Sequence, residues 1–289
     1  MKIARVTRTL ACLVMFTSLP LFGDIRISDD AGRVIVLAAP VARVISLSPH
    51  LTEMLFDLEV QDTLIGTSRY SDYPEAAKQI DIIADAFQIN VEAVIARQPD
   101  LILAWHSGGD SRALYKLEQL GFPVYRNEAK TLAGIASTFV RLATLFGVDE
   151  KGRALQASFN ERVLGIKRQY KDHTARRVFL QVSERQLYSV NDKHLIGQAL
   201  SLCQATNIFG SEDMMVAPVS TESVLVRKPD VIVISSSRLG FAEAQELWNK
   251  FQQFQGSIKY VDSGKLSRPS FRMLDGIEDL CRQIHRSAD

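Results

Sequence analysis

The sequence lacks the short motifs by which many enzymes are recognised. It has no G-x-S-x-G nucleophile elbow, P-loop, glycine-rich dinucleotide fingerprint or H-E-x-x-H pair. Its histidines show no spacing typical of metal ligands, although two of them follow predicted strand ends; they are His50, His106, His173, His194 and His285. We therefore expect no catalytic site, no bound metal and no cofactor.

The chain also lacks any run of the ~20 apolar residues that a membrane-spanning helix needs. The nearest approach is at residues 1–23, where three basic residues and no acidic residue accompany two short apolar stretches, 10–16 and 19–22. This layout predicts a secretory signal peptide over residues 1–23, with a membrane anchor as the alternative. The rest of the chain would then be secreted into the periplasm.

Charge of one sign is not in excess either. Without residues 1–23, the chain keeps 31 basic and 33 acidic residues. A nearly neutral balance with no basic cluster indicates neither a nucleic-acid partner nor an anionic membrane surface.

Cysteine is scarce. Cys12 lies in the predicted signal peptide, which leaves Cys203 and Cys281, 78 residues apart. An even pair in an oxidising compartment favours a disulfide, and two buried free thiols are the alternative.

Strand and helix patterns alternate along the chain, which predicts an α/β fold with mostly parallel sheets. A predicted hairpin at 24–37 comes first. The clearest strands are 43–47, 64–67, 101–105, 123–125, 177–182, 231–235 and 259–261. The clearest helices are 49–58, 91–97, 110–121, 131–146, 194–203, 221–227, 241–251 and 273–287. Ser48 before Pro49 is a typical helix N-cap.

A long amphipathic pattern from Asp149 to about Lys171 interrupts this alternation. Apolar residues recur there at three- and four-residue spacing, and a helix of this length spans ~30 Å. We interpret it as a rigid connector between two Rossmann-like lobes. The predicted units are an N-terminal lobe at 24–147, a connecting helix at 148–174 and a C-terminal lobe at 175–289.

An internal repeat supports two related lobes. Residues 91–105 and 221–235 share six of fifteen positions at a constant offset of 130, and each copy is a helix, a Pro-Asp break and a buried strand. Glu92 and Glu222 occupy equivalent positions in the first helical turn. A helix N-terminus stabilises a carboxylate by itself. An equivalent pair also suits docking on a two-fold symmetric partner.

Aromatic and polar residues follow the predicted strands at their carboxyl ends, where open α/β sheets bind ligands. The candidate ligand-binding residues are Ser48, Tyr70, Phe87, Trp105 and Tyr188. Aromatic side chains on such loops suit a large, flat, partly apolar ligand, although each of them taken alone is more readily explained by packing than by ligand contact.

Several segments resemble the periplasmic solute-binding proteins that carry iron complexes and cobalamin, and above all the cobalamin-binding members. The segments are RVISLSP at 43–49, YSDYP at 70–74, PDLILAW at 99–105 and RVFLQ at 177–181. The sequence departs from the cobalamin-binding pattern at Phe87 and Val216, where tryptophans are usual, and near Gly264, where an aspartate is usual.

The resemblance implies class III periplasmic binding protein architecture, with two lobes, one rigid helix and little hinge motion. It implies a Cys203–Cys281 disulfide, ligand contacts from Tyr70, Phe87, Trp105 and Tyr188, and docking of Glu92 and Glu222 on the permease dimer of an ABC importer with its ATPase subunits.

We therefore expect a monomeric periplasmic protein that captures a corrinoid, namely cobalamin, and delivers it to an importer. The nearest alternative is a haem or ferric-siderophore binder, for which Arg268 and Arg272 would supply positive charge. A corrinoid- or haem-processing enzyme and a sensor module without transport are further alternatives. The first would need a catalytic constellation, and the second gives no reason for the paired glutamates.

Overall fold

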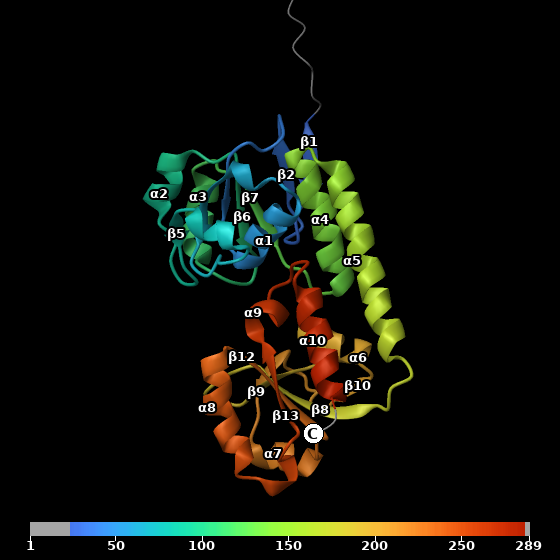
Figure 1. Ribbon diagram of the computed structural model, residues 1–289. Helices are drawn as coiled ribbons and strands as arrows, with labels where there is room; N and C mark the ends of the chain where they lie inside the picture. The colour runs from blue at the N-terminus through green and yellow to red at the C-terminus, as the bar shows by residue number, and fades with distance from the viewer. Residues whose placement is uncertain (1–23, 287–289) are drawn as a thin grey trace, which may run out of the picture.

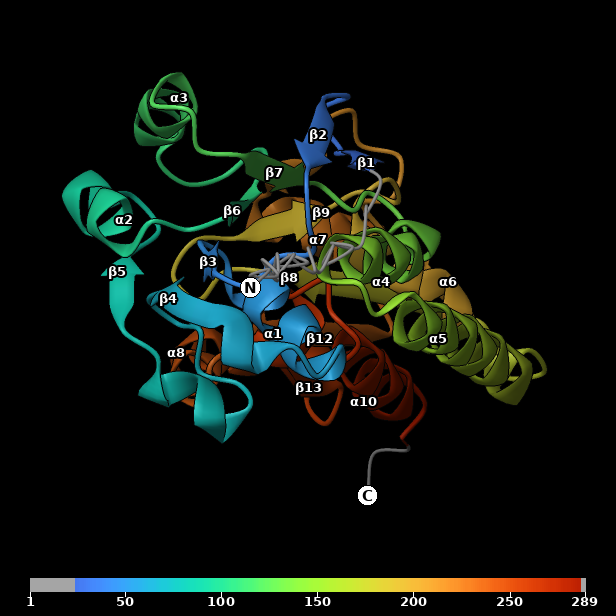
Figure 2. The same cartoon turned by 90° about the horizontal axis from the view of Figure 1, so that it is seen from above.

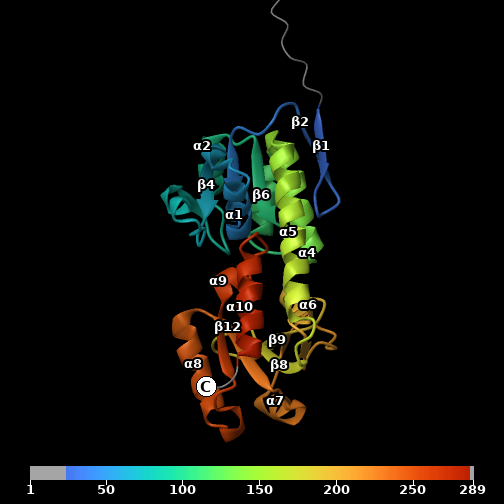
Figure 3. The same ribbon diagram turned by 45° about the vertical axis from the view of Figure 1, so that its right-hand side comes forward.

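The computed structural model describes residues 24–286, which form two α/β lobes with a long helix running beside both (Figures 1 and 3). The two-lobed architecture with parallel sheets confirms the predicted fold class. The predicted signal peptide and residue 287, the last residue of the predicted C-terminal helix, lie outside the described residues.

The N-terminal lobe contains a five-stranded parallel sheet in the order β5-β4-β3-β6-β7. Its strands are β3 (Val44–Ser46), β4 (Leu64–Ser68), β5 (Ile82–Ala84), β6 (Leu101–Trp105) and β7 (Val124–Asn127). Its helices are α1 (Pro49–Asp57), α2 (Val91–Arg97), α3 (Ser111–Gln119) and α4 (Leu132–Phe146), with short 3₁₀ turns at Gln61–Thr63 and Glu75–Gln79. Helices α2 and α3 cover one face of the sheet and α1 and α4 the other (Figure 2).

An antiparallel hairpin, β1 (Ile25–Ser28) and β2 (Val34–Leu37), precedes this sheet as the sequence predicts. Its turn contains two adjacent aspartates, Asp29 and Asp30, which contact β7 and the loop that follows it.

The C-terminal lobe repeats the plan with four parallel strands in the order β10-β8-β12-β13. The strands are β8 (Arg176–Gln181), β10 (Ala205–Asn207), β12 (Val231–Ser236) and β13 (Ile258–Asp262). The helices are α6 (Leu195–Leu202), α7 (Thr221–Arg227), α8 (Arg238–Asn249), α9 (Ser263–Leu266) and α10 (Met273–His285), with a 3₁₀ turn at Gln252–Phe254. A small antiparallel pair, β9 (Tyr188–Val190) and β11 (Val216–Pro218), lies apart from this sheet.

Differences from the predicted elements are confined to element ends and to short elements, which include the unpredicted four-residue helix α9 (Ser263–Leu266). Strands β5, β9, β10 and β11 have three residues each, too few for an alternation of polar and apolar residues to be distinctive. Helix α8 begins at Arg238 rather than at 241, because Ser237 caps it by accepting a hydrogen bond from the Gly240 amide.

The long helix α5 (Asp149–Tyr170) packs along α4 and then continues past the N-terminal lobe towards α10 (Figure 3). Gly152 permits the close approach of α4 and α5, since a Cβ atom there would lie 2.3 Å from the Ala143 side chain and 2.9 Å from the Phe139 carbonyl oxygen. At the far end, Arg162 forms ion pairs with Asp275 and Glu278 of α10. The helix is therefore attached to both lobes along its length.

One apolar core extends across both lobes. It joins residues of the N-terminal sheet, α4, α5, α10 and the C-terminal sheet. Phe271, in the loop between α9 and α10, packs edge-on against Phe139 of α4 and Phe159 of α5, with ring centroids 6.1 and 5.7 Å apart. Opening the lobes would expose this apolar surface to water, which opposes the motion.

A buried ion cluster also joins the lobes. The Glu53 side chain of α1 is 2% exposed, and it accepts hydrogen bonds from Arg268 at 2.9 Å and from Ser270 at 2.5 Å. Arg268 also pairs with Asp72, and the Arg272 guanidinium lies 4.1 Å from the Tyr73 ring centre. A buried carboxylate without such partners would be costly, so these contacts fix the α9–α10 loop against the N-terminal lobe.

Asp57, one turn after Glu53, lies beside the same loop. Burial and the nearby Glu53 charge raise its pKa to about 7, against the opposing effect of a hydrogen bond from the Phe271 amide. The folded lobe interface therefore favours the protonated form of this side chain.

A disulfide between Cys203 and Cys281 joins the end of α6 to α10, as expected. It closes a separation of 78 residues within the C-terminal lobe.

Replacing both disulfide cysteines, Cys203→Ser with Cys281→Ser, should lower the free energy of unfolding by about 4 kcal/mol, since the cross-link restricts the unfolded chain. Chemical denaturation followed by circular dichroism measures this change. Wild-type protein treated with reductant should match the double variant. Equal stability of the oxidised wild type and the double variant would contradict the expectation.

The contribution of Asp57 to the free energy of unfolding should fall as pH rises from about 4 to 7, whereas the buried neutral His50 makes an opposite contribution that grows as pH rises from about 4 to 6.5. A carboxyl group with a raised folded-state pKa stabilises fully below its unfolded value, and this stabilisation is lost as pH passes its folded pKa of about 7. Asp57→Asn should remove the falling contribution, so the stability of the variant relative to wild type should rise with pH over this window by at most about 1.4 kcal/mol per pH unit for one proton. Denaturation midpoints at several pH values test this, with the exposed Asp62→Asn as control. If the denaturation midpoint of Asp57→Asn depends on pH in the same way as that of the wild type, Asp57 does not make this contribution.

Candidate functional site

A cavity lies between the two lobes, where the carboxyl ends of both sheets face each other. It has a volume of about 430 Å³. The N-terminal lobe contributes Ser48, Pro49, His50, Trp105, Asn127, Glu128, Ala129 and Lys130. The C-terminal lobe contributes Val182, Val190, Lys193, His194, Leu195, Ile196, Met215, Val216, Leu266, Ser267, Arg268, Pro269 and Met273. This location is where open α/β sheets bind ligands.

The two walls of the cavity differ in chemistry. The C-terminal wall is mainly aliphatic and thioether, including Val190, Ile196 and Met215. The N-terminal wall carries the exposed indole of Trp105 and a group of buried polar side chains beside it. A ligand held here would therefore meet apolar surface on one side and hydrogen-bonding groups on the other.

The polar group begins with Ser48 and His50. The Ser48 hydroxyl lies 2.7 Å from His50 Nδ1, and His50 Nε2 lies 2.9 Å from Asn127 Oδ1. Burial lowers the pKa of His50 to about 4, so the ring is neutral near pH 7. Although Ser48 is at the predicted N-cap position of α1, its hydroxyl does not cap the helix and contacts His50 instead, which corrects the sequence expectation.

Trp105 ends β6 and is 46% exposed. Its Nε1 donates to Glu128 Oε1 at 3.3 Å, and the other Glu128 carboxylate oxygen accepts from the Ser107 amide at 2.9 Å. The Glu128 carboxylate thus connects the loops that follow β6 and β7 and orients the indole.

The cavity includes two of the five predicted ligand-binding residues, Ser48 and Trp105. Tyr70 and Phe87 do not line it. They follow β4 and β5 at the same edge of the sheet, where their side chains are 65% and 88% exposed. Tyr188 also does not line it and pairs with Pro218 in the β9–β11 ribbon. Ligand contact by all five remains a prediction.

Other lining residues were not singled out from the sequence, notably Asn127, Glu128 and His194. Asn127 and Glu128 stand at the carboxyl end of β7. The expectation that ligands bind at the carboxyl ends of strands, which identified Trp105, would also have identified these two residues if the predicted strand had ended at Asn127. His194 caps α6, where its Nδ1 accepts from the Ile196 amide at 3.1 Å. Burial lowers its pKa.

The repeated segments form closely matching modules, and their helices α2 and α7 lie in different lobes (Figure 1). In the N-terminal copy, the backbone amide of Arg43 donates to Asp100 at 2.8 Å, and its Nη2 donates to the Arg97 carbonyl at 2.6 Å. In the C-terminal copy, Arg177 makes the same contacts with Asp230 and the Arg227 carbonyl at the same distances.

These contacts fix the ends of α2 and α7, the helices that carry Glu92 and Glu222. Each helix ends in a left-handed residue, Gln98 at φ 45° or Lys228 at φ 48°. Both glutamates are exposed in the first turn. The two lobes therefore present one equivalent carboxylate each, on helices held in the same way.

Within residues 24–286, no group of three or more His, Cys, Asp or Glu side chains is placed to hold a metal ion. In that same range, no helix combines the length and apolar character needed to cross a bilayer.

Comparison with known proteins gives a consistent result. A family model described as periplasmic binding protein matches residues 44–255. The vitamin B12-binding protein of Vibrio cholerae serotype O1 is 33% identical over 250 residues, which cover 85% of this chain and 90% of that protein.

Solved structures agree. The crystal structure of the periplasmic vitamin B12-binding protein BtuF of Vibrio cholerae superposes with a TM-score of 0.76 at 33% identity, covering 85% of this chain and 97% of that chain. A possible iron-binding periplasmic solute-binding protein from Staphylococcus epidermidis also gives a TM-score of 0.76, at 27% identity, covering 86% and 100% of the two chains.

Proposed function

Because the chain belongs to the periplasmic binding protein family, we propose that it captures a corrinoid, namely cobalamin, in the periplasm and delivers it to an ABC importer. The observation that carries the proposal is the cavity between the two lobes, with an apolar wall on one side and Trp105 beside neutral polar groups on the other. Vitamin B12-binding proteins among the relatives supply the ligand class.

The chemistry of the walls suits a corrinoid. A corrin ring offers broad apolar faces to aliphatic and aromatic side chains, and carboxamides at its edge to hydrogen-bonding groups. A cavity of about 430 Å³ encloses only part of so large a ligand. The exposed Tyr70 and Phe87, on loops at the same sheet edge, are then available for the part that projects from it.

An anionic ferric-siderophore fits less well. Arg268 and Arg272, which would attract such a ligand, are already engaged by carboxylates of the N-terminal lobe. Arg268 pairs with Glu53 and Asp72, and Arg272 lies 3.3 Å from Glu53 and donates to the Gly264 carbonyl. Releasing either arginine for a ligand would leave the buried Glu53 carboxylate without its partners, at a large cost.

Delivery requires a partner, and Glu92 and Glu222 are the proposed contacts. Their equivalent positions match a permease formed by two equivalent subunits, each of which would offer a basic patch to one glutamate. We also propose that residues 1–23 are a cleaved signal peptide and that the protein acts as a monomer without catalysing a reaction.

Purified protein should bind cyanocobalamin with measurable heat in titration calorimetry, and more tightly than haem. Trp105→Ala should weaken this binding by about 1–3 kcal/mol, since a central aromatic anchor is removed. Tyr115→Ala, which removes an exposed aromatic ring of α3 outside the cavity, is the matched control. Tighter binding of haem would reject the corrinoid assignment, and wild-type affinity in Trp105→Ala would remove that residue from the site.

Reversing both proposed docking charges, Glu92→Lys with Glu222→Lys, should abolish importer-dependent uptake of cobalamin while leaving its affinity for the free protein unchanged, since like charges would then face each other. Radiolabelled uptake in cells or vesicles that contain the importer measures this. Asp62→Lys with Glu243→Lys reverses one exposed charge in each lobe elsewhere and should transport normally. Normal uptake by the first double variant would refute docking through these residues.

A further inference from the structure

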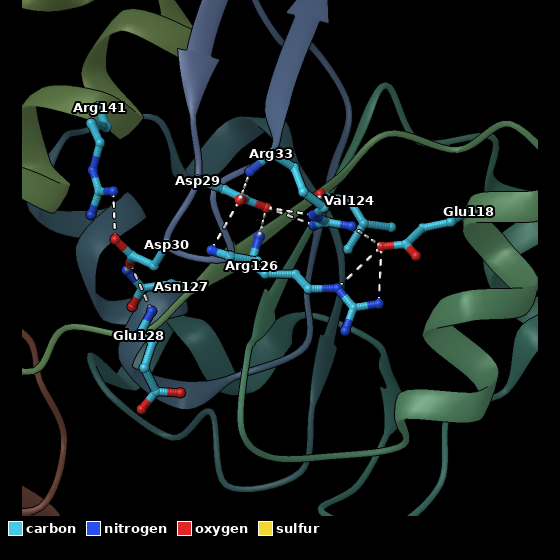
Figure 4. Close-up of polar contacts among 10 residues, drawn as sticks. Asp29, Asp30, Arg33, Glu118, Val124, Arg126, Asn127, Glu128 and Arg141 are labelled. Carbon is cyan, nitrogen blue, oxygen red and sulfur yellow. Dashed lines mark hydrogen bonds and ion pairs between the residues drawn. The ribbon is translucent and has the colours of Figure 1, made fainter.

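The two aspartates of the hairpin turn contact different groups (Figure 4). Asp29 is buried and holds the turn itself, accepting from the backbone amides of Ala31, Arg33 and Arg126 at 3.0, 2.8 and 3.2 Å. The Asp30 carboxylate contacts two residues that line the cavity, Asn127 and Glu128. Its Oδ1 pairs with Arg141 at 2.6 Å, and its Oδ2 accepts from two donors, Asn127 Nδ2 at 2.8 Å and the Glu128 amide at 2.7 Å.

One contact leads to Ser48. A carboxylate paired with an arginine only accepts hydrogen bonds, so Asn127 must offer it the amide nitrogen. Asn127 Oδ1 is then directed at His50 Nε2, which must carry the proton. His50 Nδ1 is left as an acceptor, so the Ser48 hydroxyl donates to it. With its single proton used in this way, the Ser48 oxygen can only accept from a ligand.

The second contact leads to Trp105. By holding the Glu128 backbone amide, Asp30 fixes the start of the loop that follows β7. The Glu128 side chain in turn accepts from the Trp105 indole and from the Ser107 amide. A single carboxylate oxygen thus supports both N-terminal residues that the sequence predicted as ligand contacts and that line the cavity.

We propose that Asp30 is a positioning residue for the ligand site, which orders Ser48 through Asn127 and His50, and Trp105 through Glu128. The identity of the ligand in this inference rests on the proposed function. The hairpin lies outside residues 44–255, the part that matches the family model, so this support is built by a segment that precedes the matched fold.

The arrangement also selects a ligand chemistry. The Ser48 hydroxyl in the cavity lining can only accept a hydrogen bond from a ligand. It therefore favours a ligand that presents N–H donors, such as the carboxamides of a corrinoid. It disfavours a ligand that presents carboxylates in the same place, such as haem, because two acceptors would face each other without a proton.

The test is Asp30→Asn, which keeps the size of the side chain. Its amide nitrogen must face either Arg141 or the two donors on Asn127 and Glu128, so a donor meets a donor in both orientations. Affinity for cyanocobalamin should fall about tenfold, which corresponds to about 1.4 kcal/mol. In the protein without ligand, the ¹⁵N signals of the His50 ring and of the Trp105 indole should both move.

Arg33→Gln, in the same hairpin as Asp30, is the matched control. It removes the ion pairs that Arg33 forms with Asp29 and with Glu118 of α3, and it does not change a contact of Asp30. It should lower the melting temperature while leaving cyanocobalamin affinity and both NMR signals as in the wild type. Folded Asp30→Asn with wild-type affinity and unmoved signals, or an equal loss of affinity in Arg33→Gln, would overturn the proposal.

Glu128→Ala keeps the proposal testable if Asp30→Asn does not fold, since Glu128 is only partly buried. It should move the Trp105 indole signal and weaken binding about threefold, as expected for the loss of one modest hydrogen bond. If neither the indole signal nor the affinity changes, the proposed positioning of Trp105 through Glu128 is wrong. If wild-type protein does not bind cyanocobalamin, the proposed function fails, and the NMR signals of the free variants still decide the positioning role.

Discussion

The ligand site depends on the contact between Glu53 and the α9–α10 loop of the other lobe. A buried carboxylate needs its hydrogen-bond donors, and here the donors are Arg268 and Ser270 of the C-terminal lobe. Phe271 beside them adds apolar contact with α4 and α5. Separating the lobes would expose this apolar surface and leave a charge unpaired, so the distance between the two cavity walls is set before any ligand arrives. Such preorganisation favours binding because little ordering remains to be done.

Within this frame the two lobes contribute differently. The C-terminal lobe offers mainly apolar surface, whereas the N-terminal lobe offers a tryptophan and a polar group whose proton positions follow from one carboxylate on the hairpin. Hydrogen bonds in series hold their members in one orientation, because each donor that is used determines which atom of the next group must accept. The hairpin that precedes the N-terminal sheet is therefore connected to the ligand site.

The repeat has a physical consequence for the two helices that it contains. In each copy an arginine at the start of a strand donates to a carbonyl at the end of a helix that comes later in the chain, and the aspartate of the Pro-Asp break after that helix accepts a hydrogen bond from the arginine's backbone amide. The helices that carry Glu92 and Glu222 are thereby held at their C-terminal ends by contacts of equal length. Two equivalent carboxylates on helices held in the same way would suit a two-fold symmetric partner.

Patterns among residues close together in the chain predicted much of this structure. Strand–helix alternation, the apolar spacing of α5, the repeat and the cysteine pair each depend on local patterns, and the sequence therefore determined the two-lobed α/β plan, the disulfide pair and two of the cavity residues, Ser48 and Trp105. Short strands such as β9 and β11 carry too little pattern to be found. Only the tertiary structure decided that Glu53 meets Arg268, 215 residues away, and that Asp30 meets Asn127, 97 residues away. Such pairings depend on how whole elements pack, and a carboxylate in a loop has the same local sequence signature whether it ends up in water or supports a binding site.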